Sequence, residues 1–420
     1  MYWLIENISQ LSRFYESGYK EGFLEIIPYN NTVHPTQNQV SLVYLRPLET
    51  TKGYMVCIDH SETMSLKKDW VEKLLQNYNT LYTTDQKAAL HYFNLDNLFD
   101  ITSPPFQFTP PSTPTHDLFY RQHKNRTDLN TIIPAVKHYE ICEKIFENLK
   151  DELGREKTKY DEFFSRASIV FNLVERSGIK VDKHTFEEYF HDITQDYVYT
   201  QYNLKTTTTR PSNKFNGVNY AALNKENGCR NSIIPRNNKL LEIDISAYHP
   251  TLASKIVKYT FPTQDIHSHF AEMYGVDYKT AKELTFKQLY GGVFKQYQDL
   301  EFFQKVTKYI EEIWGKFNTE GQVKCPVSNY IYKKDKLNDM NPQKLFNYIL
   351  QNVETSVNIL VLEEIFSILS NKKTKMVLYT YDAFLFDVDE SEKVIEKIEG
   401  IFKKFKLNIK KTEGKNYNFI

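Results

Sequence analysis

Residues 240–250 (LLEIDISAYHP) constrain the fold of this chain more than any other segment. Their apolar side chains predict a short β-strand, which delivers the carboxylate of Asp244 to the start of a turn into a helix. An aspartate forms strands poorly and is costly to bury, so one interpretation gives it a functional role. The other interpretation is an N-cap, because Asp244 and Ser246 both suit the start of the helix that would carry Leu252 and Ile256.

A second strand-borne aspartate, Asp382, is expected far downstream, in the β-rich run of apolar and aromatic residues 376–386 (MVLYTYDAFLF). Two carboxylates on neighbouring strands of one sheet are what a pair of Mg²⁺ ions needs for phosphoryl or nucleotidyl transfer. The second aspartate therefore favours metal binding over capping for Asp244. We predict that the two side chains lie on neighbouring strands and bind metal.

The composition limits the class of protein and its partners. Among 420 residues, Lys+Arg and Asp+Glu both number 53, so a nucleic-acid partner has to be argued from local patches. The four cysteines form no CxxC pair, which argues against a zinc ribbon and fits a reducing cytosol. Neither a secretory signal nor an apolar run of membrane-spanning length is evident. We expect a soluble cytoplasmic protein without a membrane partner, in the host cytoplasm if it is phage-encoded.

The chain changes character several times along its length. Residues 1–105 read as mixed α/β, with strands at 40–45 and 54–58 and a helix at 70–78. A proline-rich linker is predicted at 106–130, followed by a long helical region at 132–177 that ends at Gly178. From Leu240 strands alternate with helices, which are expected near 268–275, 278–290, 297–315, 342–369 and 390–405.

The polar segment 205–239 carries seven basic residues and one acidic residue, Glu226. A run of this kind can bind phosphates, or it can be a solvated loop. Both interpretations remain open at this point.

The predicted helix at 278–290 carries a third informative pattern. Lys282, Phe286 and Tyr290 are spaced four apart and form one stripe on one helix face. An aromatic stripe of this spacing is more often core than ligand contact, but a leading lysine is unusual for a core. A lysine suits a triphosphate, while the aromatic rings suit a sugar and a base.

Taken together, these segments resemble motifs A, B and C of family A DNA polymerases, in that order: Asp244-Ile-Ser, Lys282-x3-Phe286-x3-Tyr290-Gly291 and Tyr381-Asp382. The resemblance covers roughly residues 160–420, and several segments in order make it specific. The further similar segments are 175–182, 209–212 with 217–223, 265–267 with 271 and 274–276, Asn347-x3-Gln351, and 414–417.

The resemblance implies a fold, an activity and partners. The fold would be α/β (α+β), a right-hand polymerase with palm, fingers and thumb. The activity would be template-directed extension of a primer–template DNA with dNTPs. Short length and compact fingers suggest a phage or mobile-element enzyme, with phage replication proteins as possible partners.

The resemblance also implies roles for individual residues. Two Mg²⁺ ions (Mn²⁺ possible) would be held by Asp244, Asp382 and the backbone carbonyl of Ile245, and would activate the primer 3′-hydroxyl and stabilise the leaving pyrophosphate. The residues expected at the dNTP are His249, His267, Lys279, Lys282, Phe286 and Tyr290. Those expected at DNA are Arg210, Asn219, Arg230, Asn347, Gln351 and Tyr381.

Four positions depart from the family pattern. The glutamate five residues after the motif A aspartate is here His249, which is also bulky enough to help exclude a 2′-hydroxyl. The spacing from Asp244 to Pro250 echoes motif A of family B polymerases, although the 282–290 spacing favours family A. Tyr278 replaces a fingers arginine, and motif C has Tyr381 and Ala383 in place of histidine and glutamate.

By the same resemblance, the domains are expected as follows: 1–105 a degenerate ribonuclease-H-like 3′–5′ exonuclease domain, 106–130 the linker, 131–204 the thumb leading into the palm, 205–259 the palm with motif A, 260–330 the fingers with motif B, and 331–420 the palm with motif C and a terminal strand. Such exonucleases begin with Asp-x-Glu on the first strand, where this chain has only Glu25. Proofreading is therefore not expected, and an unrelated accessory domain is the alternative.

Two other functions stay open at this stage. A single-subunit RNA polymerase shares the palm and the fingers lysine and tyrosine, although Phe286 argues against it because those enzymes usually carry methionine there. A catalytically silent nucleic-acid-binding relative would keep the groove without metals. Retention of both aspartates disfavours the second alternative.

Overall fold

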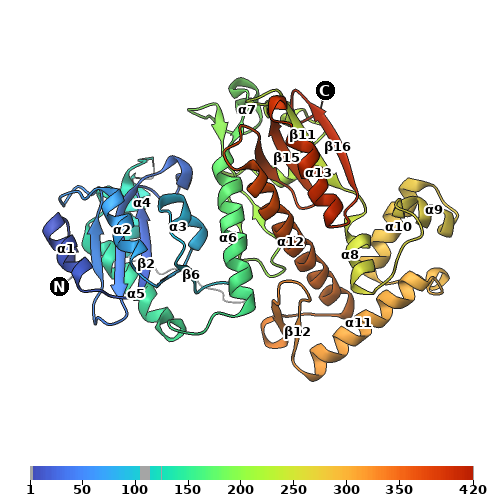
Figure 1. The fold of residues 1–420 in the computed structure, drawn as a ribbon, viewed down its shortest axis with the longest axis horizontal. Helices are drawn as coiled ribbons and strands as arrows, with labels where there is room; N and C mark the ends of the chain where they lie inside the picture. Colours follow the sequence, from blue (N-terminus) through green and yellow to red (C-terminus); the bar gives the residue numbers. More distant parts are fainter. Residues whose placement is uncertain (1–2, 105–113, 124, 420) are drawn as a thin grey trace. The chain divides into compact units, whose positions relative to one another are not determined.

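The protein, a computed structural model that describes residues 3–104, 114–123 and 125–419, divides into two compact units. Unit 1 is Met1–Asn172 and unit 2 is Leu173–Ile420 (Figure 1). Residues 106–113 and 124 of the predicted proline-rich linker (106–130) lie outside the described residues, and helix α4 (Pro114–His123) occupies part of the remainder. None of the described helices is both long and apolar enough to cross a lipid bilayer.

Unit 1 is built on a six-stranded mixed sheet of order β1-β4-β3-β2-β5-β6. Strands β2, β3 and β4 are antiparallel, whereas β5 and β6 continue parallel to β2, and β1 is parallel to β4. The strands are β1 (Trp3–Ile5), β2 (Glu21–Pro28), β3 (Val40–Pro47), β4 (Tyr54–Cys57), β5 (Thr80–Thr83) and β6 (Leu98–Asp100).

This sheet buries both of its faces, because successive side chains of a strand point to opposite sides. Leu24 and Val43 belong to one core, together with helices α1 (Ile8–Glu16), α2 (Lys68–Gln76) and α3 (Gln86–Tyr92). Phe23 and Leu42 belong to the other core, which α5 (Ala135–Leu149) covers. The predicted segment 131–204 is thus divided, since its first helix packs on the sheet of unit 1.

The helical region predicted at 132–177 consists of two helices with an interruption between them. Helix α5 ends at Leu149, a 3-10 turn follows at Lys150–Glu152, and α6 begins only at Lys159 and runs to Ser177. The buried carboxylate of Asp161 organises the interruption, since it accepts hydrogen bonds from Arg155 (2.6 Å) and from the backbone N–H of Thr158 (2.8 Å). Gly178 follows α6 with φ +62°, which confirms the predicted C-terminal glycine.

Unit 2 is built on a four-stranded antiparallel sheet of order β14-β15-β11-β16. These strands are β11 (Lys239–Ile245), β14 (Lys375–Tyr379), β15 (Ala383–Val388) and β16 (Ile409–Gly414). The long helix α12 (Pro342–Leu369) and the shorter α13 (Ile395–Lys404) run along this sheet (Figure 1). Helix α12 has buried residues on several sides, as expected for a helix enclosed within a core.

The other helices of unit 2 extend beyond this sheet. Helix α8 (Tyr248–Ile256) follows β11, and α9 (Ile266–Tyr274) packs beside α10 (Tyr278–Gly291). The remaining elements are α7 (Lys183–Tyr189), α11 (Glu301–Thr319) and three small antiparallel pairs: β7 (Ile179–Lys180) with β8 (Tyr197–Val198), β9 (Tyr202–Asn203) with β10 (Ser212–Asn213), and β12 (Gln322–Lys324) with β13 (Ile331–Lys333).

A pair of glycine substitutions tests the packing of unit 1. A Cβ added at Gly53 would lie 2.3 Å from the ring of Tyr44, which is buried and donates a hydrogen bond to Glu143 (2.8 Å). Gly53→Ala should therefore lower the free energy of unfolding by about 1–3 kcal/mol. At Gly315, in the interior of α11, a Cβ meets no atom within 4 Å. Gly315→Ala should therefore raise the free energy of unfolding by about 0.5–1 kcal/mol. Chemical denaturation measures the free energy of unfolding of both variants. An unchanged free energy of unfolding for Gly53→Ala would contradict the close packing around Tyr44.

Candidate active site

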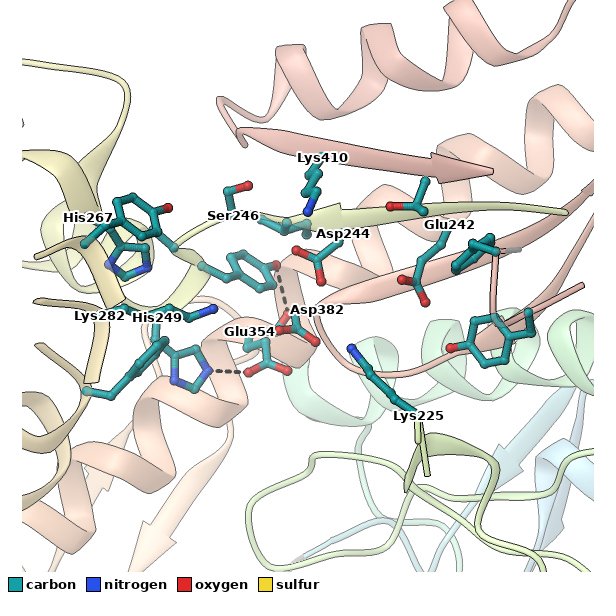
Figure 2. Close-up of a pocket in the computed structure, with 18 of the residues that line it drawn as sticks. Lys225, Glu242, Asp244, Ser246, His249, His267, Lys282, Glu354, Asp382 and Lys410 are labelled. Carbon is teal, nitrogen blue, oxygen red and sulfur yellow. Dashed lines mark hydrogen bonds and ion pairs between the residues drawn. The ribbon is translucent and has the colours of Figure 1, made fainter. Parts of the chain in front are cut away.

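The two predicted metal-binding aspartates are brought together by the pairing of the central strand β11. Its register sets Asp244 opposite Ala383 on β15 and Lys410 on β16. The backbone N–H of Ile245 donates to the carbonyl oxygen of Asp382 at 2.8 Å. The carboxylates of Asp244 and Asp382 consequently face the same space (Figure 2).

Asp382 is not on a strand, so this part of the prediction was wrong. Strand β14 ends at Tyr379 and β15 begins at Ala383, which leaves Asp382 in the connecting turn. The turn needs a left-handed residue, and Tyr381 takes that conformation with φ +71°. A non-glycine residue held in this region stores strain, which is typical of functional sites.

The capping interpretation of Asp244 is not what the structure has. The N-cap of α8 is Ala247, in left-handed conformation with φ 49°, and no side chain caps this helix. Asp244 is instead half-buried at the wall of a cavity of about 590 Å³.

Burial and neighbouring negative charge both act on the aspartates. Burial, Asp382 and Glu242 raise the pKa of Asp244 to about 6, although Lys282 and Lys225 oppose the shift. Asp382 keeps contact with solvent, but its partial burial against the cavity wall and the carboxylate of Glu354 raise its pKa as well. Each carboxylate is therefore harder to ionise in the absence of a cation.

This donor set fits magnesium. Mg²⁺ is commonly bound through one or two carboxylates, with waters and substrate phosphates completing its octahedron. Within the described ranges, no group of three or more His, Cys, Asp and Glu side chains is arranged to hold a metal. Asp244 and Asp382 offer carboxylate oxygens, which are the donors that this cation prefers.

The stripe on α10 faces the cavity rather than a core. Lys282 is exposed, Phe286 and Tyr290 are half-buried, and all three line the cavity. The helix buries its other face, through Ala281 and Leu289 among others. The rings of Phe286 and Tyr290 are stacked nearly parallel, with centroids 6.0 Å apart, and this pair is the aromatic wall of the cavity.

His267 on α9 has a buried imidazole that a polar ligand could bind. Its side chain lines the cavity, the residue is only 3% exposed, and within the described part of the chain neither ring nitrogen has a hydrogen-bond partner. Burial and the nearby Lys282 lower its pKa, which favours a neutral imidazole near pH 7. A buried polar group without a partner is costly, so a ligand atom that hydrogen-bonds it would recover that cost.

Several further polar residues of the cavity were not predicted. Lys225 and Lys410 extend their amines toward the two aspartates, and Glu242 lies two residues before Asp244 on the same face of β11 (Figure 2). Glu354 on α12 is 1% exposed and bonded to Arg210 and His249. Glu354 is the only acidic residue of α12 before Glu363, and this was the available signal, because buried acids are rare unless paired.

Two of the predicted DNA-binding arginines have protein partners in this structure. Arg210 forms an ion pair with Glu354 (2.9 Å), and its guanidinium lies 4.0 Å from the ring centroid of Tyr381. Arg230 is buried, donates to the carbonyl of Leu223 (3.0 Å) and lies over Tyr417. Both arginines also line the cavity.

The other predicted contacts lie outside the lining of the cavity. Asn219 caps a 3-10 turn at Tyr220–Ala222 through the N–H of Ala221. Asn347 donates weakly to the carbonyl of Tyr290 (3.4 Å), and Gln351 is half-buried one turn further along α12. Lys279 is exposed on α10. The lining includes the predicted residues Arg210, Arg230, Asp244, Ile245, His249, His267, Lys282, Phe286, Tyr290 and Asp382, but not Asn219, Lys279, Asn347, Gln351 or Tyr381.

The fold is similar to that of a solved DNA polymerase domain. The POL domain of Pol1 from M. smegmatis, in complex with DNA primer-template and dNTP, matches with a TM-score of 0.67 over 99% of this chain and 99% of that chain. The sequence identity is 10%, so the likeness establishes the fold. No protein-family model and no curated protein matches the chain. The likeness confirms the predicted mixed α/β fold of a DNA polymerase domain.

The raised pKa of Asp244 predicts a pH-dependent stability of the metal-free protein. The folded state keeps this proton up to about pH 6, whereas the reference aspartate has a pKa of 3.8. The folded state thus binds more protons between these values, and its stability falls as the pH rises through them. At about pH 7.5 Asp244→Asn should therefore raise the free energy of unfolding, on the order of 1 kcal/mol after allowance for solvent screening.

The same variant should bind Mg²⁺ and Mn²⁺ more weakly in calorimetry, with less proton release on binding. Asp389→Asn is a matched control, because hydrogen bonds from Ser391 lower the pKa of Asp389. This control should not stabilise the protein or change metal binding. Destabilisation by Asp244→Asn at neutral pH would contradict the assigned shift.

Proposed function

We propose that the protein is a template-directed DNA polymerase of the family A type, which extends a primer 3′-end with dNTPs by two-metal nucleotidyl transfer. One observation carries this proposal. In a fold similar to a POL domain bound to primer-template and dNTP, the Asp244 and Asp382 carboxylates share one cavity with the Lys282 stripe of α10. A phage or mobile-element origin stays a prediction from the sequence.

Asp244, Asp382 and the backbone carbonyl of Ile245 would hold the two Mg²⁺ ions, with Mn²⁺ as a substitute. When bound, the ions would supply Lewis-acid chemistry, lowering the pKa of the primer 3′-hydroxyl and neutralising charge on the leaving pyrophosphate. The hydrogen bond between Ile245 and Asp382 fixes the spacing of these ligands through the main chain. The aspartates therefore need little rearrangement to receive the metals.

The cationic side of the cavity suits a triphosphate. Lys282 offers a compact charge, and the neutral imidazole of His267 can donate one hydrogen bond to a phosphate oxygen. Lys225 and Lys410 add positive charge around the aspartates (Figure 2). Together these groups would offset the charge that develops on the leaving group.

The aromatic wall of Phe286 and Tyr290 suits the nucleoside. Flat aromatic faces stack on sugars and bases without reading sequence, as a template-directed enzyme requires. We include Arg210, Asn219, Arg230, Asn347, Gln351 and Tyr381 in the proposal as contacts to the duplex. The two arginines would have to share their guanidinium groups between DNA and their protein partners.

We further propose that unit 1 is a degenerate exonuclease-like domain without proofreading activity. Burial raises the pKa of Glu25 to about 7 on the central strand β2, although the side chain of Thr84 bonds its carboxylate (2.7 Å). Asp100 on β6 accepts from the backbone N–H of Gln86 (3.1 Å) and from Thr102. Both acids are thus hydrogen-bonded within the protein, and the strand carries only Glu25 where such exonucleases begin with Asp-x-Glu.

A primer-extension assay tests the proposed activity. The wild-type protein should extend a primed template with dNTPs and Mg²⁺, and should leave a mismatched 3′-end intact. Asp382→Asn should lower the rate by about a thousandfold or more, because an essential metal ligand is lost. Unprimed synthesis from NTPs would favour the RNA polymerase alternative. Unchanged extension by Asp382→Asn would refute the metal site.

Two lysines of α10 test which face of the helix meets the triphosphate. Lys282 lines the cavity, whereas Lys279, three residues earlier, does not. We expect Lys282→Ala to raise the KM for dNTP by about tenfold or more, with a lower kcat, since a charge-assisted contact to phosphate is lost. Lys279→Ala should stay within about twofold of wild type, as an exposed charge does. Equal effects of the two variants would contradict this orientation of α10.

A further inference from the structure

Glu354 lies at the centre of a buried polar network that joins several elements of unit 2. The residue is 1% exposed, and its carboxylate accepts from Nη2 of Arg210 at 2.9 Å and from Nε at 3.1 Å. The same carboxylate is bonded to Nε2 of His249 (Figure 2). A buried carboxylate is tolerated when it is paired in this way, and removal of a partner is costly.

The network continues from His249 to the aromatic wall. Nδ1 of His249 is hydrogen-bonded to the hydroxyl of Tyr290 on α10, and the two rings meet nearly edge to face at 79°. Both ring nitrogens of His249 are thus engaged, Nε2 by the Glu354 carboxylate and Nδ1 by the Tyr290 hydroxyl. Glu354 thereby holds the orientation of the imidazole.

We propose that Glu354 is a positioning residue of the nucleotide site, which acts through His249 to hold Tyr290 in place. This inference rests on the proposed function and deepens it. The side chain at position 249 has no carboxylate of its own, and α12 supplies one. The stacking of Phe286 on Tyr290 carries the effect along the wall where the nucleoside would bind.

The ion pair with Arg210 extends the same control to the metal side of the cavity. Arg210 lies between Glu354 and the ring of Tyr381, the residue that precedes Asp382. Through Arg210 on one side and His249 on the other, the carboxylate of Glu354 is connected to both walls of the cavity. The effect of Glu354 on nucleotide binding can be separated from its ion pair with Arg210. Only the effect on nucleotide binding depends on the contacts through His249 and Tyr290.

Steady-state extension by variants at both ends of the path tests the inference. Glu354→Gln removes the charge with little change in volume, and Tyr290→Phe removes the hydroxyl while leaving the Arg210 ion pair intact. We expect each variant to raise the KM for dNTP by about tenfold, with a smaller effect on kcat. The variant that combines both substitutions should have a KM no higher than that of either single variant, because each substitution interrupts the same series of contacts from Glu354 to Tyr290.

Glu364→Gln is the matched control on the same helix, since Glu364 pairs with Lys404 away from the cavity lining (2.7 Å). It should leave the KM unchanged. Glu354→Asp keeps a charge for Arg210 but draws the carboxylate back from His249, so it carries the same test should Glu354→Gln unfold. A wild-type KM in a folded Glu354 variant, or a roughly hundredfold effect in the double variant, would overturn the inference.

The wild-type protein distinguishes failure of the inference from failure of the proposed function. Absence of extension by wild type would count against the polymerase activity. The binding of dATP measured by calorimetry, which needs no turnover, would then still compare Glu354→Gln with wild type. Equal affinity of the two proteins would overturn the role of Glu354.

Discussion

The candidate site depends on the hydrogen-bonded pairing of β11 with strands on both of its sides. Because the pairing register of a strand determines which side chains share a face, a slip of one residue would turn Asp244 away from the cavity. The register also places the turn that holds Asp382 beside the end of β11, where Ile245 bonds to it. The two aspartates, the lysines Lys225, Lys282 and Lys410 and the aromatic wall are all arranged around this one strand end.

Helix α12 supports the arrangement from the core. Glu354 and Asn358 are one turn apart, and so they share a face of the helix. The side chain of Asn358 donates to the carbonyl of Tyr381 (2.8 Å) and accepts from the hydroxyl of Tyr248 (2.7 Å). The strained turn before Asp382 and the helix after β11 are therefore tied to the same buried surface. Buried networks that are fully bonded rigidify a core in this way.

Local patterns were sufficient to predict the elements that carry the site, but not the contacts between them. The strand at 240–245 and the helices at 278–290 and 342–369 follow from periodicity, which is a local property. The turn at Asp382 and the interruption after Leu149 depend on tertiary hydrogen bonds, which periodicity does not encode. Glu354 is separated from His249 by more than one hundred residues, so its partner was not deducible from a single sequence.

The hydrogen bond between Ile245 and Asp382 has a consequence for how the fold tolerates substitution. Both of its atoms belong to the main chain, so substitution of the side chains on these strands does not remove it. The position of the turn beside the end of β11 is thus set by the backbone, whichever side chains surround it. A chain that shares 10% of its residues with a polymerase domain can therefore have that domain's fold, with different side chains around the same strand end.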